Sequence, residues 1–206
     1  MPEAVAPGRP LVLVHGLWWG RPSMAPLRRR ARGRGYDARV FHYHTHREAP
    51  ERAAERLARF AAALGEPAGY IGHSLGGLML ALAAGGLPPG RIVMVGSPIG
   101  GSAAARRVAG WGPARHLLGR AGDLLQAGAT AWPAEREVGM IAGDRPFGVG
   151  RVTGALEDGG DGTVALAETR HPALAAHCVL PVTHTGMLFS AAVAEAAFRF
   201  VETGAF

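Results

Sequence analysis

The sequence is poor in several residue types, and each shortage excludes a class of protein. It has one cysteine, Cys178, which excludes a disulfide framework and any zinc site that depends on cysteine ligands. It has no lysine and no asparagine, so arginine alone supplies the 22 basic side chains. Acidic residues are also few, so a small arginine excess accounts for the formal net charge of +6, which by itself indicates no particular partner.

Long apolar runs are missing as well. The longest, residues 75–87, is interrupted by glycines and is too short to cross a bilayer. The apolar run near the start follows no basic segment and is too short for a signal peptide. With 48% hydrophobic and 18% charged residues, the 206-residue chain predicts one globular domain over residues 1–206, and we expect it in the cytoplasm.

Strand-like and helix-like segments alternate along the chain. Strands are expected at residues 10–15, 37–43, 68–73, 91–97, 137–143 and 177–182. Helices are expected at residues 22–34, 50–64, 75–85 and 187–202. This alternation predicts a three-layer α/β fold with about six mainly parallel strands and helices on both faces of the sheet. The longer connection at residues 98–135 is read either as a crossover helix with a loop or as a small lid over a pocket.

The most informative motif is G-x-S-x-G at residues 72–76, with Ser74 at its centre. It lies between an expected strand and an expected helix, which is the context that a nucleophile elbow requires. The turn is so tight that the residues two before and two after the serine must be small. The turn lifts the hydroxyl above the sheet at the amino end of the helix, where free N–H groups favour negative charge. We therefore predict Ser74 as a nucleophile.

A serine nucleophile needs a base, and the base needs a carboxylate to orient it. His184 directly follows the last expected strand, and Asp161 lies in the Gly-rich segment before that strand. These residues fall at the carboxyl ends of strands, where open α/β sheets bind ligands. Asp144, directly after a strand, is the alternative acid, and Asp158 is a third candidate; we favour Asp161.

The oxyanion hole is predicted from the segment after the first strand. His15 and Gly16 stand at the carboxyl end of that strand, and the N–H that follows such a turn faces the nucleophile. We predict the backbone N–H groups of Leu17 and Leu75 as the two donors. His15 is expected to order the donor loop, and His73 to pack beneath the nucleophile turn.

With these motifs, the chain resembles the small α/β-hydrolases of the bacterial lipase and esterase type. The resemblance runs through VLVHG, GHSLGG, DGTV and HTGML, and covers nearly the whole chain. It implies hydrolysis of a small-molecule or lipid ester through an acyl-enzyme, with no metal and no organic cofactor. The chain is shorter than most relatives, so we expect no large cap domain. An acyltransferase, a thioesterase and an inactive binding protein on the same scaffold are the alternatives.

Three other patterns suggest further sites. The histidines at 42, 44 and 46 alternate as on one face of a strand, but no carboxylate stands near them, so we do not expect a metal site. The arginines of residues 28–39 match the solvent face of a helix; no nucleic-acid module accompanies them, so we expect weak attraction to anionic lipid surfaces at most. Four tryptophans suggest an apolar pocket for the acyl or alcohol group: Trp18, Trp19, Trp111 and Trp132.

Overall fold

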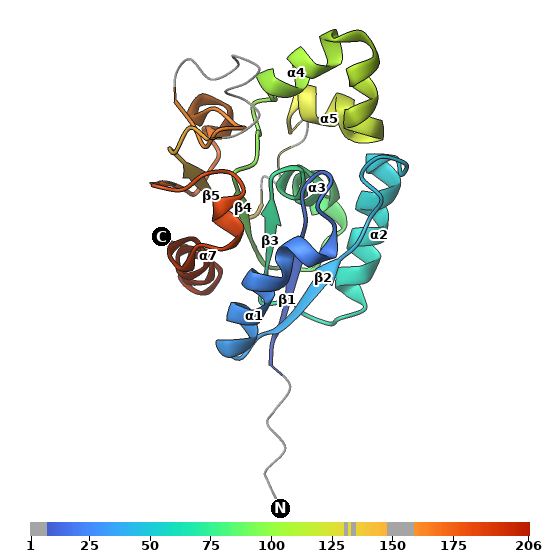
Figure 1. Cartoon of the computed structure of the whole chain (residues 1–206). Helices are drawn as coiled ribbons and strands as arrows, with labels where there is room; N and C mark the ends of the chain where they lie inside the picture. Colours follow the sequence, from blue (N-terminus) through green and yellow to red (C-terminus); the bar gives the residue numbers. More distant parts are fainter. Residues whose placement is uncertain (1–7, 130–131, 133–134, 148–158) are drawn as a thin grey trace, which may run out of the picture.

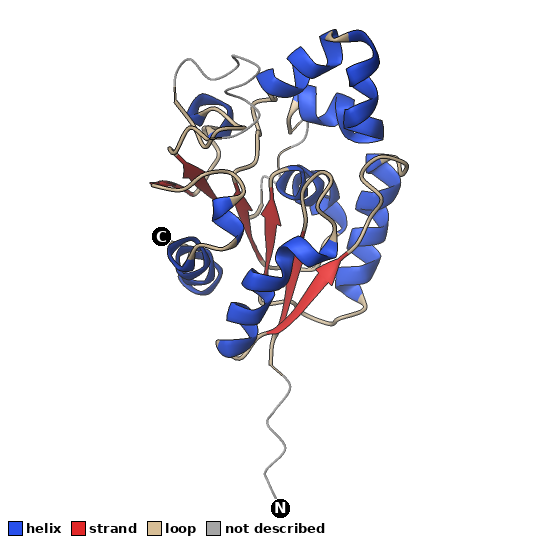
Figure 2. Ribbon diagram, in the orientation of Figure 1, coloured by secondary structure: helices blue, strands red, loops and turns tan. Residues whose placement is uncertain are grey.

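The computed structural model describes residues 8–129, 132, 135–147 and 159–206. Its centre is a six-stranded sheet in the order β2-β1-β3-β4-β5-β6, in which all neighbouring strands are parallel. The strands are β1 (Pro10–Val14), β2 (Asp37–Phe41), β3 (Gly69–His73), β4 (Arg91–Val95), β5 (Val138–Gly143) and β6 (Ala176–Leu180). Figure 2 shows this sheet enclosed by helices on both sides.

Helices cover both faces of the sheet, which gives the expected three-layer architecture (Figure 1). The helices of the two layers are α1 (Ala25–Gly33) and α7 (Ala191–Thr203) on one face, and α2 (Pro50–Ala62) and α3 (Leu75–Ala83) on the other. In β1, Leu11 and Leu13 pack toward α1 and α7, whereas Val12 and Val14 pack toward α2 and α3. A strand with apolar side chains on both faces reads as a continuous apolar run, as the β1 sequence does.

The three-layer α/β prediction is confirmed, and the differences lie at the ends of elements. β2 and β4 each end two residues earlier than expected, and a short 3-10 turn (Gly186–Leu188) stands where the last helix was expected to begin. Cys178 lies in β6 and is only partly buried, because β6 is an edge strand of the sheet. No helix of the described ranges is long and apolar enough to cross a membrane.

The long connection after β4 folds into three short helices. These are α4 (Ala103–Gly110), the 3-10 helix η3 (Gly112–Ala121) and α5 (Gly122–Ala127). Figure 1 shows this group beyond the carboxyl ends of the strands, above the sheet edge from which α3 begins. Within the part of the chain that the structure describes, no large cap domain accompanies it. The group is therefore placed to form a wall of any site at that edge.

Candidate active site

Ser74 occupies the turn that joins β3 to α3. Its φ is 55°, a left-handed conformation that a side chain rarely adopts, and its backbone N–H donates to the Val95 carbonyl at 2.8 Å. A Cβ at Gly72 would lie 2.5 Å from the carbonyl carbon of Gly76, and a Cβ at Gly76 would meet the Val14 carbonyl oxygen. Small residues are required at both positions because the helix starts against the sheet, as the motif predicted.

Asp161 and His184 form a buried pair. The Oδ2 atom of Asp161 lies 2.7 Å from Nδ1 of His184, and the backbone N–H of His184 donates to the Asp161 carbonyl at 2.8 Å. The second carboxylate oxygen, Oδ1, accepts the backbone N–H groups of Thr163 at 2.9 Å and Val164 at 2.8 Å. Asp161 is 1% exposed. These hydrogen bonds therefore fix the direction of the carboxylate toward the imidazole.

Two glycines that the sequence analysis did not single out make room for this pair. Gly96, directly after β4, has a φ of 59°, and a Cβ there would lie 3.1 Å from Oδ2 of Asp161 and 3.2 Å from Nδ1 of His184. At Gly143, the last residue of β5, a Cβ would lie 2.9 Å from Cβ of Asp161. In the sequence, the only feature that could have indicated this role was a glycine at or directly after the end of an inner strand. The pair thus lies directly on the strand ends.

Ser74 and His184 line the same cavity, which has a volume of about 180 Å³. Its walls come from the loop after β1, from α4, η3 and α5, and from the segment around Thr163 and Val164. The described lining residues include no aspartate, glutamate or arginine, and most are apolar. Trp18 and Trp19 contribute to the wall as expected. The expectation is wrong for the other two tryptophans: Trp111, between α4 and η3, is exposed, and Trp132 stacks on His171.

The two predicted oxyanion donors lie beside Ser74. Leu75 is the first residue of α3, so its backbone N–H has no acceptor within the helix. Leu17 lines the cavity, and its N–H donates to no other described residue. Gly16 brings this loop close, because a Cβ at Gly16 would lie 3.1 Å from Cβ of Ser74. Both N–H groups are therefore available to a negatively charged oxygen near the serine.

Two histidines next to the site, His15 and His73, are buried, and burial lowers the pKa of both. Nε2 of His73 lies 3.0 Å from the His184 carbonyl oxygen, and burial lowers the pKa of His73 to about 3. His15 stacks on Tyr43 with 4.6 Å between ring centroids, and burial lowers the pKa of His15 to about 4. The Tyr43 hydroxyl donates to the His15 carbonyl at 2.9 Å. Both imidazoles support the surrounding backbone, as expected.

The structure describes one of the two alternative acids, Asp144. Asp144 directly follows β5, but its side chain is exposed, and its backbone N–H donates to the Leu180 carbonyl at 3.2 Å. Asp158 lies outside the described residues. Of the two candidate carboxylates that the structure describes, Asp161 is the one that it brings to His184.

Within the part of the chain that the structure describes, the remaining sequence patterns form no second site near Ser74. β2 ends at Phe41, so the histidines at 42, 44 and 46 do not share the face of a strand. Among the described residues there is no group of three or more His, Cys, Asp or Glu side chains that could hold a metal ion. On the basic helix face, Arg34 forms ion pairs with Glu195 and Glu202 of α7, both at 2.8 Å.

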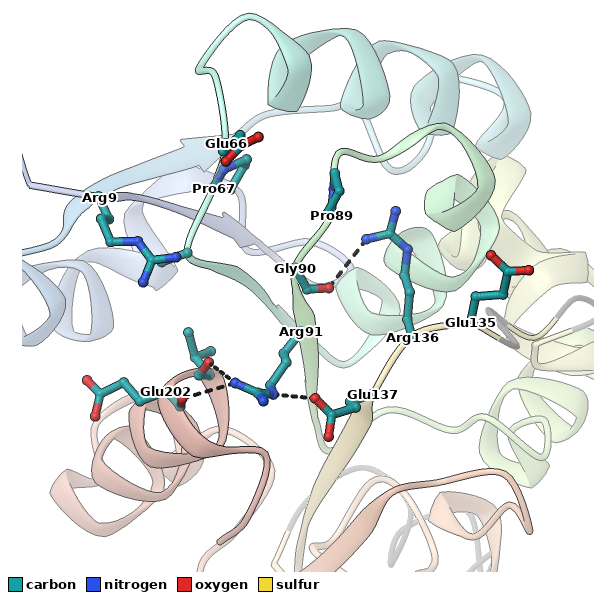
Figure 3. Close-up of a pocket in the computed structure, with 12 residues that line it drawn as sticks. Arg9, Glu66, Pro67, Pro89, Gly90, Arg91, Glu135, Arg136, Glu137 and Glu202 are labelled. Carbon is teal, nitrogen blue, oxygen red and sulfur yellow. Dashed lines mark hydrogen bonds and ion pairs between the residues drawn. The ribbon is translucent and has the colours of Figure 1, made fainter.

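A larger, polar cavity of about 600 Å³ lies at the opposite edge of the sheet, where β4 and β5 begin (Figure 3). Its central guanidinium groups are already engaged. Arg91 pairs with Glu137 at 2.5 Å and donates to the Glu202 carbonyl at 3.0 Å, and Arg136 donates to the Pro88 and Gly90 carbonyls. These arginines join the segments that precede β4 and β5, and the described residues that line this cavity include no serine, cysteine or histidine.

Comparison with known proteins identifies the family of this chain. The sequence profile described as "Alpha/beta hydrolase family" matches residues 11–199. The chain belongs to the alpha/beta hydrolase family. This membership accounts for the parallel sheet and for the turn that holds Ser74. A search of curated proteins finds no significant match to the sequence.

Several solved structures of lipases and esterases share the alpha/beta hydrolase fold of this chain. The mature form of a lipase from Bacillus licheniformis superposes with a TM-score of 0.74 and 19% identity, covering 99% of this chain and 95% of that one. Its propeptide form gives a TM-score of 0.79 and 21% identity, covering 97% of this chain and 51% of that one. An esterase from Exiguobacterium antarcticum gives 0.65 and 12%, with 95% and 92% covered. At these identities the likeness establishes the fold alone.

Proposed function

We propose that this alpha/beta hydrolase cleaves carboxylic esters through an acyl-enzyme, with Ser74 as nucleophile, His184 as base and Asp161 as the acid that orients the base. One observation carries the proposal: Ser74, with its positive φ, and His184, which is paired with the buried Asp161 at 2.7 Å, line the same mostly apolar cavity. A carboxylate that fixes Nδ1–H of an imidazole leaves Nε2 free to accept a proton from a serine hydroxyl.

The reaction follows from these positions. His184 takes the Ser74 proton while the Ser74 oxygen attacks the ester carbonyl carbon. The carbonyl oxygen becomes an anion and is held by the N–H groups of Leu17 and Leu75. His184 then gives its proton to the leaving alcohol, and the acyl group remains on Ser74. Water activated by His184 attacks the acyl-enzyme in the second half and releases the acid.

The cavity favours a particular type of substrate. An apolar wall without charged side chains suits an uncharged acyl group, and a volume of about 180 Å³ suits a short or medium chain. A series of p-nitrophenyl esters from acetate to palmitate tests this expectation, with kcat/KM highest at the short end. Activity confined to long, emulsified esters would contradict it. A lipid ester at an anionic surface stays within the proposal, and vesicle sedimentation with and without anionic lipid tests the expected weak attraction.

A fluorophosphonate probe tests the proposed nucleophile directly. We expect it to label the wild-type protein covalently and to leave Ser74→Ala unlabelled, with circular dichroism showing that both are folded. A folded wild type that reacts with neither the probe nor any p-nitrophenyl ester would indicate the alternative, a hydrolase scaffold kept for binding. If the probe labels Ser74 but amines, alcohols or thioesters react faster than simple esters, the protein is an acyltransferase or thioesterase on the same three residues.

A further inference from the structure

We propose that Trp18 is a positioning residue for the oxyanion hole: its indole N–H fixes the loop that carries the Leu17 donor. The inference rests on the proposed function, because it assigns a task within the same reaction. Trp18 directly follows Leu17 in the loop after β1 and lines the cavity that contains Ser74. Its side chain reaches two segments that are remote in the sequence.

The indole N–H takes part in a cluster of three residues, which we call the indole clasp: Trp18, His46 and Leu117. Nε1 of Trp18 donates to the Leu117 carbonyl oxygen at 2.8 Å and lies 3.1 Å from Nε2 of His46. The same carbonyl oxygen lies 2.7 Å from Nε2 of His46. A carbonyl oxygen has two lone pairs, so it accepts from both rings when His46 carries its proton on Nε2. The clasp thus joins the loop after β1, the loop after β2 and the helix η3 at one oxygen.

The backbone of Trp18 is strained, which is why a tie at this point matters. Its φ is 68°, and Trp18 and Ser74 are the two non-glycine residues with positive φ in the described ranges. A bulky residue adopts this conformation only when its surroundings hold it there, and such residues cluster at functional sites. Ser74 is the proposed nucleophile, and Trp18 directly follows Leu17, which supplies a proposed oxyanion donor.

The two partners of Trp18 in the indole clasp, His46 and Leu117, lie in segments that contact each other closely. The backbone N–H of Arg120 donates to the His46 carbonyl at 3.0 Å. Gly119 has a φ of 56° and packs so closely that a Cβ there would meet the His46 backbone. Leu118, next to the accepting carbonyl, is 4% exposed and lines the cavity. The oxyanion loop is therefore anchored to a fixed wall of the site, and that wall sets the direction of the Leu17 N–H.

Trp18→Phe tests the proposal, since phenylalanine keeps an aromatic ring on the wall but removes the donor. Trp19→Phe is the matched comparison. Trp19 is the next residue, lines the same cavity, is 52% exposed against 53% for Trp18, and has no hydrogen bond from its indole to any described residue. It therefore measures what the loss of an indole ring costs apart from the clasp.

We expect kcat for p-nitrophenyl butyrate to be roughly threefold to tenfold lower in Trp18→Phe than in Trp19→Phe, the effect of one lost hydrogen bond. KM should differ by less than about twofold between them, because the clasp acts on the transition state and both variants lose the same ring area. The affinity for benzeneboronic acid, which forms a tetrahedral adduct with a serine hydroxyl, should fall by the same factor as kcat. Titration with the fluorophosphonate counts reactive sites, so kcat per titrated site does not depend on any misfolded fraction.

Equal kcat per titrated site in the two variants would overturn the proposal. So would a loss in Trp18→Phe that appears only in KM, because this would make Trp18 a substrate contact and no more. These outcomes differ from a failure of the proposed function, in which the wild type itself reacts with neither the probe nor the ester.

Discussion

Replacing Asp161 by asparagine has a consequence that follows from the hydrogen bonds around its carboxylate. Oδ1 accepts two backbone N–H groups, from Thr163 and Val164, and Oδ2 faces Nδ1 of His184. An asparagine at this position must turn its carbonyl oxygen toward the two backbone donors, since an NH2 group cannot accept from them. Its NH2 group then faces His184 and donates to Nδ1.

The tautomer of His184 is therefore reversed in Asp161→Asn. Nδ1 becomes the acceptor and Nε2 carries the proton, so the imidazole cannot take the proton of Ser74. In a serine triad this change lowers kcat by about 10⁴-fold, which corresponds to about 5.5 kcal/mol at about 1.36 kcal/mol per tenfold. We expect a loss of about this size, because the contacts of Asp161 leave the asparagine no second orientation.

The assay is kcat for p-nitrophenyl acetate, with a thermal melt to verify folding. Asp144→Asn is the control, since the Asp144 side chain is exposed whereas Asp161 is buried. We expect the kcat of this control to stay within about twofold of the wild type. If Asp161→Asn keeps more than a tenth of the wild-type kcat, or if Asp144→Asn loses more than Asp161→Asn, our assignment of the acid is wrong.

Three further expectations follow. Gly96→Ala should lower kcat and the melting temperature, with a loss of about 1–3 kcal/mol in the free energy of unfolding. The reason is that φ at Gly96 is 59° and the new Cβ would lie 3.1 Å from the buried Asp161 carboxylate. Gly33→Ala is the control and should not destabilise the fold, because a Cβ at Gly33 has open space around it. Burial lowers the pKa of His73 from 6.5 to about 3, so the unfolded chain binds a proton that the folded one does not between these values. The free energy of unfolding should therefore fall as pH drops below about 6.5, by up to about 1.4 kcal/mol per pH unit, and urea titrations should give a shallower slope for His73→Gln. Arg34→Ala should cost about 1 kcal/mol or less at low salt and nothing measurable at 1 M NaCl, because its ion pair with Glu202 is partly exposed.

Much of the fold could be predicted from the order of apolar segments. The inner strands carry apolar side chains on both faces and appear in the sequence as short continuous runs, so their existence and parallel arrangement followed directly. The ends of elements were less well predicted. The strand expected at 37–43 ends at Phe41, and the chain then forms the loop that contains His46. The His46 carbonyl accepts the backbone N–H of Arg120, and local propensity cannot predict a contact between such distant residues.

The candidate site divides in the same way. The turn at Ser74 could be predicted from neighbouring residues alone, because such a turn requires small residues at fixed spacing. The five consecutive residues 72–76 contain this pattern. The choice between Asp161 and Asp144 could not be made locally, since both follow strands and both suit a turn. It depended on which carboxylate the loop before β6 carries to His184, and that is decided by packing against Gly96 and Gly143.

The sequence by itself therefore determined the layer architecture and the tight turn at Ser74, because periodicity and steric fit act over a few neighbouring residues. Only the tertiary structure decided the partner of His184, the absence of Trp111 and Trp132 from the cavity wall, and the tie between Trp18 and Leu117. These depend on contacts between residues 23 to 99 positions apart, whose geometry is fixed only when the sheet brings its strand ends together.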